Sequence, residues 1–98
     1  MQLKWTDLAN ADLEQVEAYI SRENSIGVAI DIVLRMIGAV EMILPNHPEA
    51  GRFGRVMNTR ELVINGVPFI VIYRILDRPR RVEILRVLHD SQQWPPIN

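Results

Sequence analysis

Three arginines and one histidine are the residues of this sequence whose types and spacing are best suited to chemistry. Arg60, Arg74 and Arg86 each fall in a segment with the character of a β-strand, and His89 ends the last of these segments. Guanidinium groups bind phosphates through paired hydrogen bonds, and a histidine can act as a general acid or base near neutral pH. On neighbouring strands, Arg60, Arg74 and His89 could cleave RNA without a metal.

The same arginines have a simpler interpretation. Arg74 and Arg86 could form ion pairs across the strands with Glu61 and Glu83. Such cross-strand pairs stabilise a sheet by roughly 0.2–1 kcal/mol each. The residue pattern alone favours this structural role.

Other kinds of site find little support in the sequence. There is no cysteine, and the two histidines, His47 and His89, lack the paired spacing of metal ligands, so we expect no metal site. Residues 51–54 contain two glycines but lack the preceding strand and following helix of a nucleotide-binding loop, so we expect no cofactor.

The first half of the chain predicts a short strand at residues 2–5 and a helical hairpin at about 6–44. Thr6 is a good N-cap, and Pro45 ends the second helix. Apolar residues recur at helical spacing on one face of each helix. These are Ala9, Leu13, Val16 and Ile20, and then Ile30, Val33, Ile37, Val40 and Leu44. Residues 45–54, rich in proline and glycine, predict a loop.

The second half predicts three strands, at 59–64, 69–76 and 81–89, in a meander at about 59–89. Asn65-Gly66 is a strong hairpin signal between the first two, and residues 90–98 predict an irregular tail. The element order is therefore β-α-α-β-β-β. We expect one α+β domain over residues 1–98, an antiparallel sheet with the helical hairpin packed on one face.

The last two strands are apolar on both faces, although one helical hairpin covers only one. We expect Val82, Ile84 and Leu88 on one face of the last strand, with Leu85 and Val87 on the other. An open apolar face typically marks a partner site. The alternative is that the tail, with Trp94, folds back over this face.

Charge is divided unequally along the chain. Residues 1–50 have a net charge of −5 and residues 51–98, which hold eight arginines, have +4. This asymmetry points to a polyanion or an acidic protein as partner of the second half, or to arginines that merely keep the strands soluble. No apolar run is long enough to span a membrane and no targeting signal is visible, so we expect a cytoplasmic protein.

Several segments together resemble the RelE/ParE toxin superfamily of bacterial toxin–antitoxin modules, most closely its ParE branch. The similarity extends over roughly residues 3–95. It is carried by Trp5, Ala9, Asp12-Leu13, Tyr19-Ile20, Asn24, Gly51-Arg52, residues 59–63, Ile72-Tyr73-Arg74, residues 83–89, Gln92 and Trp94-Pro95.

The resemblance implies the β-α-α-β-β-β fold and a toxin neutralised by a cognate antitoxin, whose C-terminal segment wraps onto it. ParE-like toxins block DNA gyrase, whereas RelE-like toxins cut mRNA on the ribosome. Here the only lysine is Lys4, the third strand begins Pro68-Phe69-Ile70 without a basic residue, and no tyrosine follows His89. These differences favour gyrase inhibition by binding, and a ribosome-dependent mRNA endonuclease is the alternative; direct nucleic-acid binding stays open.

Under the leading hypothesis, we expect the arginine-rich half to bind the target. We expect the flank of the helical hairpin and the apolar sheet face to bind the antitoxin. The expected target-binding residues are Arg52, Arg60, Arg74, Arg86, His89 and Trp94. The expected antitoxin-binding residues are Val63, Ile70, Ile72, Leu85 and Val87. The alternative enzyme would use Arg60, Arg74 and His89 as catalytic residues.

Overall fold

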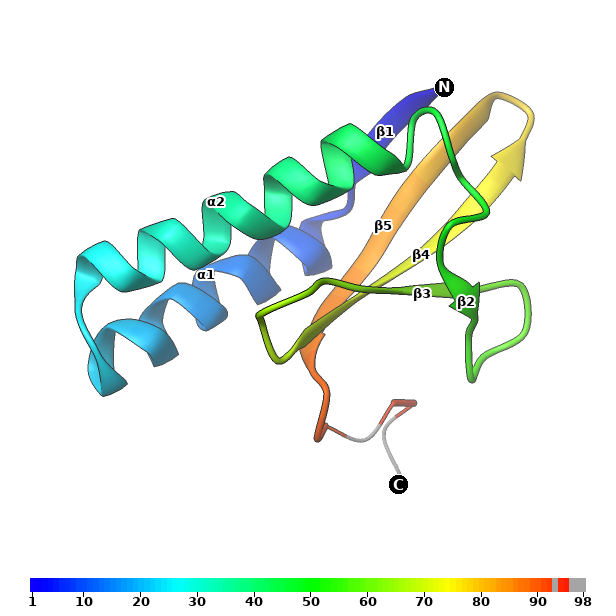
Figure 1. Cartoon of the computed structure of the whole chain (residues 1–98). Coiled ribbons are helices and arrows are strands. Elements are labelled where there is room, and N and C mark those ends of the chain that lie inside the picture. The colour runs from blue at the N-terminus through cyan, green and yellow to red at the C-terminus, as the bar shows by residue number, and fades with distance from the viewer. Residues whose placement is uncertain (93, 96–98) are drawn as a thin grey trace.

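The protein is a two-layer structure in which two helices pack side by side on one face of a five-stranded sheet (Figure 1). The computed structural model describes residues 1–92, 94 and 95. The elements are β1 (Gln2–Trp5), α1 (Asp7–Glu23), α2 (Ile26–Ile43), β2 (Arg52–Phe53), β3 (Arg60–Val63), β4 (Phe69–Asp77) and β5 (Arg80–His89). The sheet order is β1-β5-β4-β3-β2. The predicted α+β fold with a helical hairpin on one face is confirmed.

Each helix begins at a side chain that accepts a hydrogen bond from its first turn. The Thr6 hydroxyl accepts from the Ala9 amide and donates to the Ile84 carbonyl, at 3.2 and 2.8 Å. The Ser25 hydroxyl accepts from the Val28 amide at 3.1 Å. Because Thr6 bonds both to its own helix and to β5, it fixes the start of α1 against the sheet.

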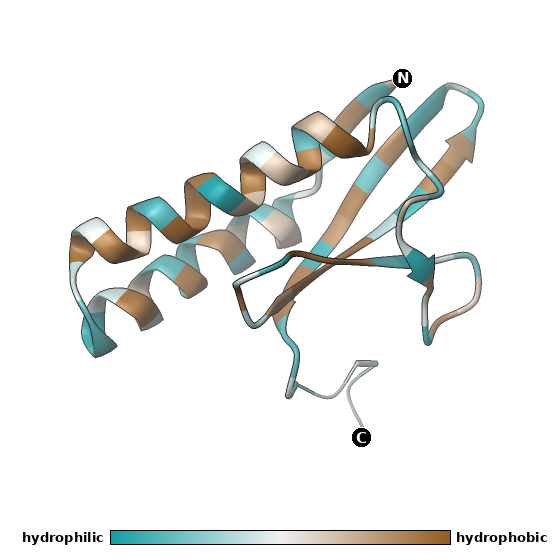
Figure 2. Cartoon of the chain, viewed as in Figure 1, coloured by the Kyte–Doolittle hydropathy of each residue, from teal (hydrophilic) through white to brown (hydrophobic). Residues whose placement is uncertain are grey.

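The main core lies between the helices and the sheet, and Figure 2 shows apolar residues along both. On α2 the buried residues are Ala29, Met36 and Val40. Ile30, which the spacing predicted to be buried, is instead exposed. Apolar residues cover most of the circumference of α2, so periodicity alone could not select the side that faces the core.

The sheet differs from the predicted one at both edges. Arg52–Phe53 forms the short strand β2, which pairs with Glu61 and Arg60 where a loop was expected. A two-residue strand is too short to produce an alternating pattern, so it left no signal in the sequence. At the other edge, β1 pairs with β5 in parallel, so the sheet is mixed rather than antiparallel. Most of the chain separates these strands, and a parallel pair needs such a long connection.

A β-bulge in β5 changes which side chains face the core. Ile72 lies opposite Arg86 while Tyr73 lies opposite Ile84, so Leu85 is an extra residue without a partner on β4. One extra residue reverses the alternation beyond it. Val87 therefore packs in the main core, and Leu88 lies on the outer face with Leu85. The predicted assignment of Val87 and Leu88 to faces is wrong for this reason.

The outer face of the sheet holds a second, smaller apolar cluster. Ile70, Ile72 and Leu88 form it, and Leu85 and Trp94 pack against it. Ile70 and Ile72 are buried, so the prediction of an open apolar face is wrong. Trp94, from the predicted irregular tail, contributes to the cover; residues 93 and 96–98 of that tail lie outside the described part.

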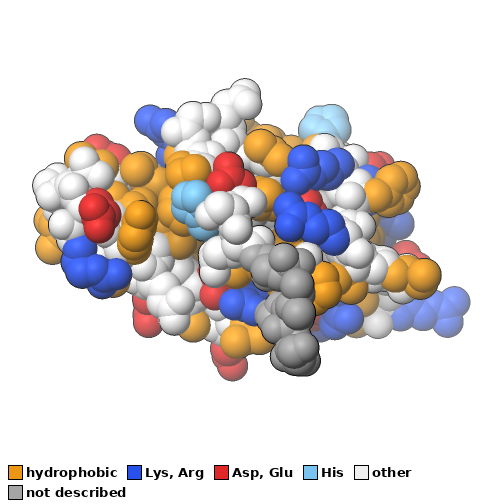
Figure 3. Space-filling view, turned by 90° about the horizontal axis from the view of Figure 1, so that it is seen from below, with side chains coloured by type: hydrophobic (Ala, Val, Ile, Leu, Met, Phe, Trp, Pro, Cys, Tyr) orange, Lys and Arg blue, Asp and Glu red, His pale blue; other side chains and the backbone are white. Residues whose placement is uncertain are grey.

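Ion pairs surround this cluster on the outer face. The buried Glu83 carboxylate accepts from Arg74 Nε at 2.8 Å and from Arg81 Nη2 at 2.6 Å. The hydrogen bond from Arg74 is the main cause that holds the pKa of Glu83 below its usual range, and Arg81 adds to the effect. Arginines gather on the side of the molecule away from the link between the helices (Figure 3).

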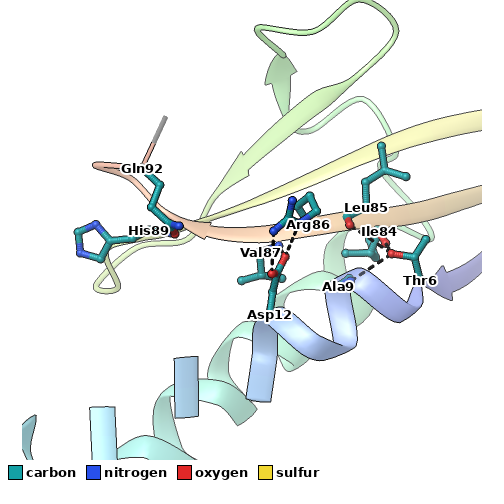
Figure 4. A network of polar contacts seen from close by, with 9 residues as sticks. All are labelled: Thr6, Ala9, Asp12, Ile84, Leu85, Arg86, Val87, His89 and Gln92. Atoms are coloured by element: carbon teal, nitrogen blue, oxygen red, sulfur yellow. Dashed lines mark hydrogen bonds and ion pairs between the residues drawn. The ribbon is translucent and has the colours of Figure 1, made fainter. Parts of the chain in front are cut away.

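Asp12 of α1 closes the edge of β5 beyond the point where β1 ends. Its carboxylate accepts from Arg86 Nε at 2.8 Å, from Arg86 Nη2 at 3.0 Å and from the Val87 amide at 2.9 Å (Figure 4). The pair also raises the pKa of Arg86 above its usual value. The buried Asp12 carboxylate thus satisfies the Val87 amide, which a neighbouring strand would otherwise pair.

The variant Asp12→Ala should destabilise the protein by about 3 kcal/mol, because it leaves a partly buried guanidinium and a buried amide without partners. Urea unfolding followed by circular dichroism measures this change. The exposed Glu14 on the same helix is the control, and Glu14→Ala should change the free energy of unfolding by less than about 0.5 kcal/mol. Equal effects at the two positions would contradict the proposed closure.

The Glu83 carboxylate should make stability depend on pH in a defined direction. Because folding lowers its pKa, its contribution is present above pH 4.5, the usual value for a glutamate, and is lost as pH falls through the lower folded value. The difference in free energy of unfolding between the wild type and Glu83→Gln should therefore shrink below pH 4.5. Urea titrations at several pH values test this, with Glu17→Gln as control for an exposed glutamate. A pH-independent difference would refute the prediction.

Candidate functional site

The residues predicted for RNA cleavage do not meet at one place. Arg60 lies opposite Tyr73, which packs in the main core on the helix side of the sheet. Arg74 is the next residue on β4 and therefore points to the outer face. His89 lies opposite Phe69. Phe69 is four residues from Tyr73 on β4, a separation of about 13 Å along the strand. The three side chains thus occupy three separate positions on the sheet.

Arg60 instead holds the loop that precedes β2. Its Nη1 donates to the Gly51 carbonyl at 2.8 Å, and its guanidinium lies 4.5 Å from the centre of the Phe53 ring. The buried Tyr73 hydroxyl accepts from the Gly51 amide at 2.8 Å and donates to the Pro48 carbonyl at 2.6 Å. Burial raises the pKa of Tyr73, so its hydroxyl stays protonated and keeps both bonds.

The other predicted target-binding arginines also have partners within the chain. Arg52 pairs with Glu61 at 3.0 Å and Arg86 with Asp12 at 2.8 Å. The Arg86 guanidinium also lies 5.7 Å from the centre of the Trp94 ring. Of the pairings weighed from the sequence, Arg74 with Glu83 is confirmed, whereas Arg86 reaches a helix rather than a strand. These arginines therefore form ion pairs that stabilise the fold, and only the exposed parts of their side chains are accessible to a partner.

His89 borders a cavity of about 540 Å³ between α1 and the end of β5. Tyr19, Arg22 and Arg86 contribute to its lining. His89 Nδ1 lies 3.1 Å from the Ser91 amide nitrogen and 3.1 Å from Asp90 Oδ1. Neither Arg60 nor Arg74 lines this cavity.

The five residues predicted to contact an antitoxin differ in accessibility. Ile70, Ile72 and Val87 are buried within the chain, Leu85 is half-buried, and only Val63 is well exposed. β2 pairs with Arg60 and Glu61 alone, so the edge of β3 at Leu62 and Val63 has no strand neighbour among the described residues. This short free edge is available for pairing with another chain.

Two exposed apolar surfaces contain residues that were not predicted individually, although the flank of the helical hairpin was expected to bind the antitoxin. Ile26, Ile30 and Leu34 lie four residues apart on α2 and form what we call the helix stripe. Phe53 at the end of β2 and Met57 in the connection between β2 and β3 form the second surface. The helix stripe had a signal in the sequence, the excess of apolar residues on α2. The second surface had none, because two isolated apolar residues are ordinary.

The described residues contain neither a group of metal ligands nor a membrane-spanning helix. Within residues 1–92, 94 and 95, no three histidine or acidic side chains are grouped so that they could hold a metal ion. In the same part of the chain, neither helix is long and apolar enough to cross a membrane.

Comparison with known proteins gives a consistent result. The family model described as the ParE toxin of type II toxin–antitoxin systems, parDE, matches residues 3–94. A Sinorhizobium fredii protein named "Putative toxin Y4kP" is 41% identical over 96 residues, which is 98% of this chain and 95% of that protein.

Solved structures agree with this family. A chain of the chromosomal ParDE toxin–antitoxin system from P. aeruginosa superposes with a TM-score of 0.84 and 27% identity, over 91% of this chain and 95% of that one. A chain of the RelBE2 toxin–antitoxin complex from Mycobacterium tuberculosis has a TM-score of 0.55 and 22% identity, over 90% and 95%. The second likeness is one of fold alone.

The family model and the Sinorhizobium relative both span almost the whole chain, and the helical hairpin on a mixed sheet is the fold of these toxins. The chain belongs to the ParE toxin family of type II toxin–antitoxin systems, within the RelE/ParE superfamily.

Proposed function

We propose that this ParE-family toxin inhibits DNA gyrase by binding it, and that a cognate antitoxin neutralises the toxin by covering its exposed apolar surface. One observation carries the binding mechanism: Arg60, Arg74 and His89 lie at three separate positions on the sheet. A nuclease would need its cations and its general acid or base around one phosphate. Inhibition by binding needs only an accessible surface.

Charge supports a protein as the target. Three of the expected target-binding arginines form ion pairs with carboxylates of the same chain, which partly compensate their charge. The pairs are Arg52 with Glu61, Arg74 with Glu83 and Arg86 with Asp12. Binding to a nucleic-acid backbone needs several cations free to neutralise phosphates. Partly compensated arginines beside apolar side chains are more typical of protein interfaces.

The antitoxin surface that we propose is centred on α2. Ile70, Ile72 and Val87 on the sheet were expected to bind the antitoxin but are buried. The proposed surface therefore consists of Val63 on the free edge of β3 and the helix stripe. An amphipathic segment can place apolar side chains against Ile26, Ile30 and Leu34, because side chains four residues apart on a helix form a continuous row. Both gyrase and such an antitoxin would be met in the cytoplasm.

The purified chain should inhibit supercoiling by gyrase and leave ribosome-bound mRNA intact. Both reactions are to be run with the same preparation, followed by plasmid topology on agarose gels and by primer extension on the message. Loss of supercoiling or trapped cleaved DNA, with intact mRNA, is the expected result. Cleaved mRNA with normal supercoiling would replace the proposal with the endonuclease alternative.

The variant Leu34→Ser should weaken binding of the antitoxin by about tenfold or more, because it removes a large apolar side chain from the helix stripe. The antitoxin is the small protein encoded beside the toxin gene, and isothermal titration calorimetry measures its affinity. Leu8→Ser is a matched control, since Leu8 on α1 is 61% exposed and Leu34 is 59% exposed. Equal affinities of both variants and the wild type would rule out the helix stripe as the antitoxin surface.

A further inference from the structure

The end of β2 and the loop that follows it each present one large apolar side chain to solvent. Met57 is 85% exposed and Phe53 is 82% exposed. They border a hollow of about 650 Å³, to which Arg60 and Ile75 also contribute. Neither side chain contributes much to the free energy of folding, because folding does not remove either from water.

This loop is held in one conformation by its own hydrogen bonds. The Gly54 amide donates to the Thr59 carbonyl at 2.8 Å, and the Thr59 hydroxyl donates to the Val56 carbonyl at 2.6 Å. A side chain at Gly54 would collide with Thr59, and Asn58 has a positive φ of 66°. Asparagine tolerates this left-handed conformation better than most residues. The loop that presents Met57 is therefore ordered.

A buried carboxylate anchors the base of the same loop. Glu61, which is 2% exposed, accepts from Arg52 Nη2 at 3.0 Å and from the Arg55 amide at 3.1 Å. Its charge holds the backbone at Arg55 and the side chain of Arg52 in place. The side chains of Arg52 and Arg55 each still keep about half of their surface in solvent.

The surface that results is apolar at its centre and positive at its border. The Arg60 guanidinium stacks on the Phe53 ring at 4.5 Å, and Arg55 lines the same hollow. The Glu61 carboxylate, which pairs with Arg55, is buried. Ordered aromatic, methionine and arginine side chains are enriched at the energetic centres of protein interfaces.

We propose that the surface formed by Phe53 at the end of β2 and Met57 in the following loop, with Arg55 and Arg60 at its border, is the surface with which the toxin binds its target. It fits a protein that offers an apolar pocket bordered by carboxylates, because the surface has apolar anchors and exposed guanidinium groups. This inference rests on the proposed function, in which the target is gyrase. The helix stripe on α2 is left to the antitoxin.

Two substitutions at Met57 test the apolar contact and the charge separately. Met57 forms no hydrogen bond or ion pair within the described residues and is almost fully exposed, so both Met57→Asp and Met57→Lys should fold. Met57→Asp should raise the half-inhibitory concentration in the gyrase supercoiling assay by about tenfold or more, because it places a carboxylate against an acidic border. Met57→Lys should cause a clearly smaller loss.

The helix stripe provides the reciprocal control. Leu34→Ser should inhibit gyrase like the wild type, and Met57→Asp should bind the antitoxin like the wild type. Unchanged inhibition by Met57→Asp would overturn the proposal, as would a loss of antitoxin binding in its place. Equal losses in Met57→Asp and Met57→Lys would refute the acidic border.

A growth assay separates failure of this inference from failure of the proposed function. If the wild type does not inhibit gyrase, the choice of gyrase is wrong, and arrest of bacterial growth on expression becomes the readout for the loop. Met57→Asp, present at the same soluble level, should then relieve the arrest while Leu34→Ser does not. Arrest by Met57→Asp as strong as that by the wild type would overturn the loop proposal, and a wild-type chain that is inactive in both assays would overturn both proposals.

Discussion

The contact between Asp12 and the edge of β5 sets the position of the helices on the sheet. β1 pairs with β5 only as far as Ile84, and beyond that residue the Asp12 carboxylate takes up the Val87 amide and the Arg86 guanidinium. A buried amide and a buried charge must both be satisfied, so α1 has little freedom to slide along the strand. The bulge at Leu85 is part of the same arrangement, since it places Arg86 and Val87 where Asp12 meets them.

Buried carboxylates bind many of the arginines in the second half of the chain, and of these carboxylates only Asp12 lies in the acidic first half. Asp12, Glu61 and Glu83 each bind at least one arginine of the second half, and Glu61 and Glu83 each contact two. Much of the positive charge that looked available for a polyanion is therefore used inside the fold. The large apolar side chains that stay exposed include the helix stripe on α2 and Met57 in the connection between β2 and β3, so they lie on different elements.

Much of the fold could be predicted from local patterns, and little of the site could. Thr6 and Ser25 begin the helices, and Asn65-Gly66 forms a turn in which Gly66 has a φ of 84°. These signals act within a few residues, so they are readable in the sequence. The strand β2, the bulge at Leu85 and the burial of Ile72 depend on residues distant in the chain. No local pattern contains that information.

The sequence by itself determined the family, the residue types that any site could use and the element order except for β2. Only the tertiary structure decided which of those residues act together. Arg60 and Arg74 lie on opposite faces because a strand alternates its side chains and the pairing register sets which face each residue joins. His89 lies beside α1 because the bulge and the Asp12 contact define how β5 ends. Register and packing are properties of the whole sheet, and they separated a cluster that residue types alone had suggested.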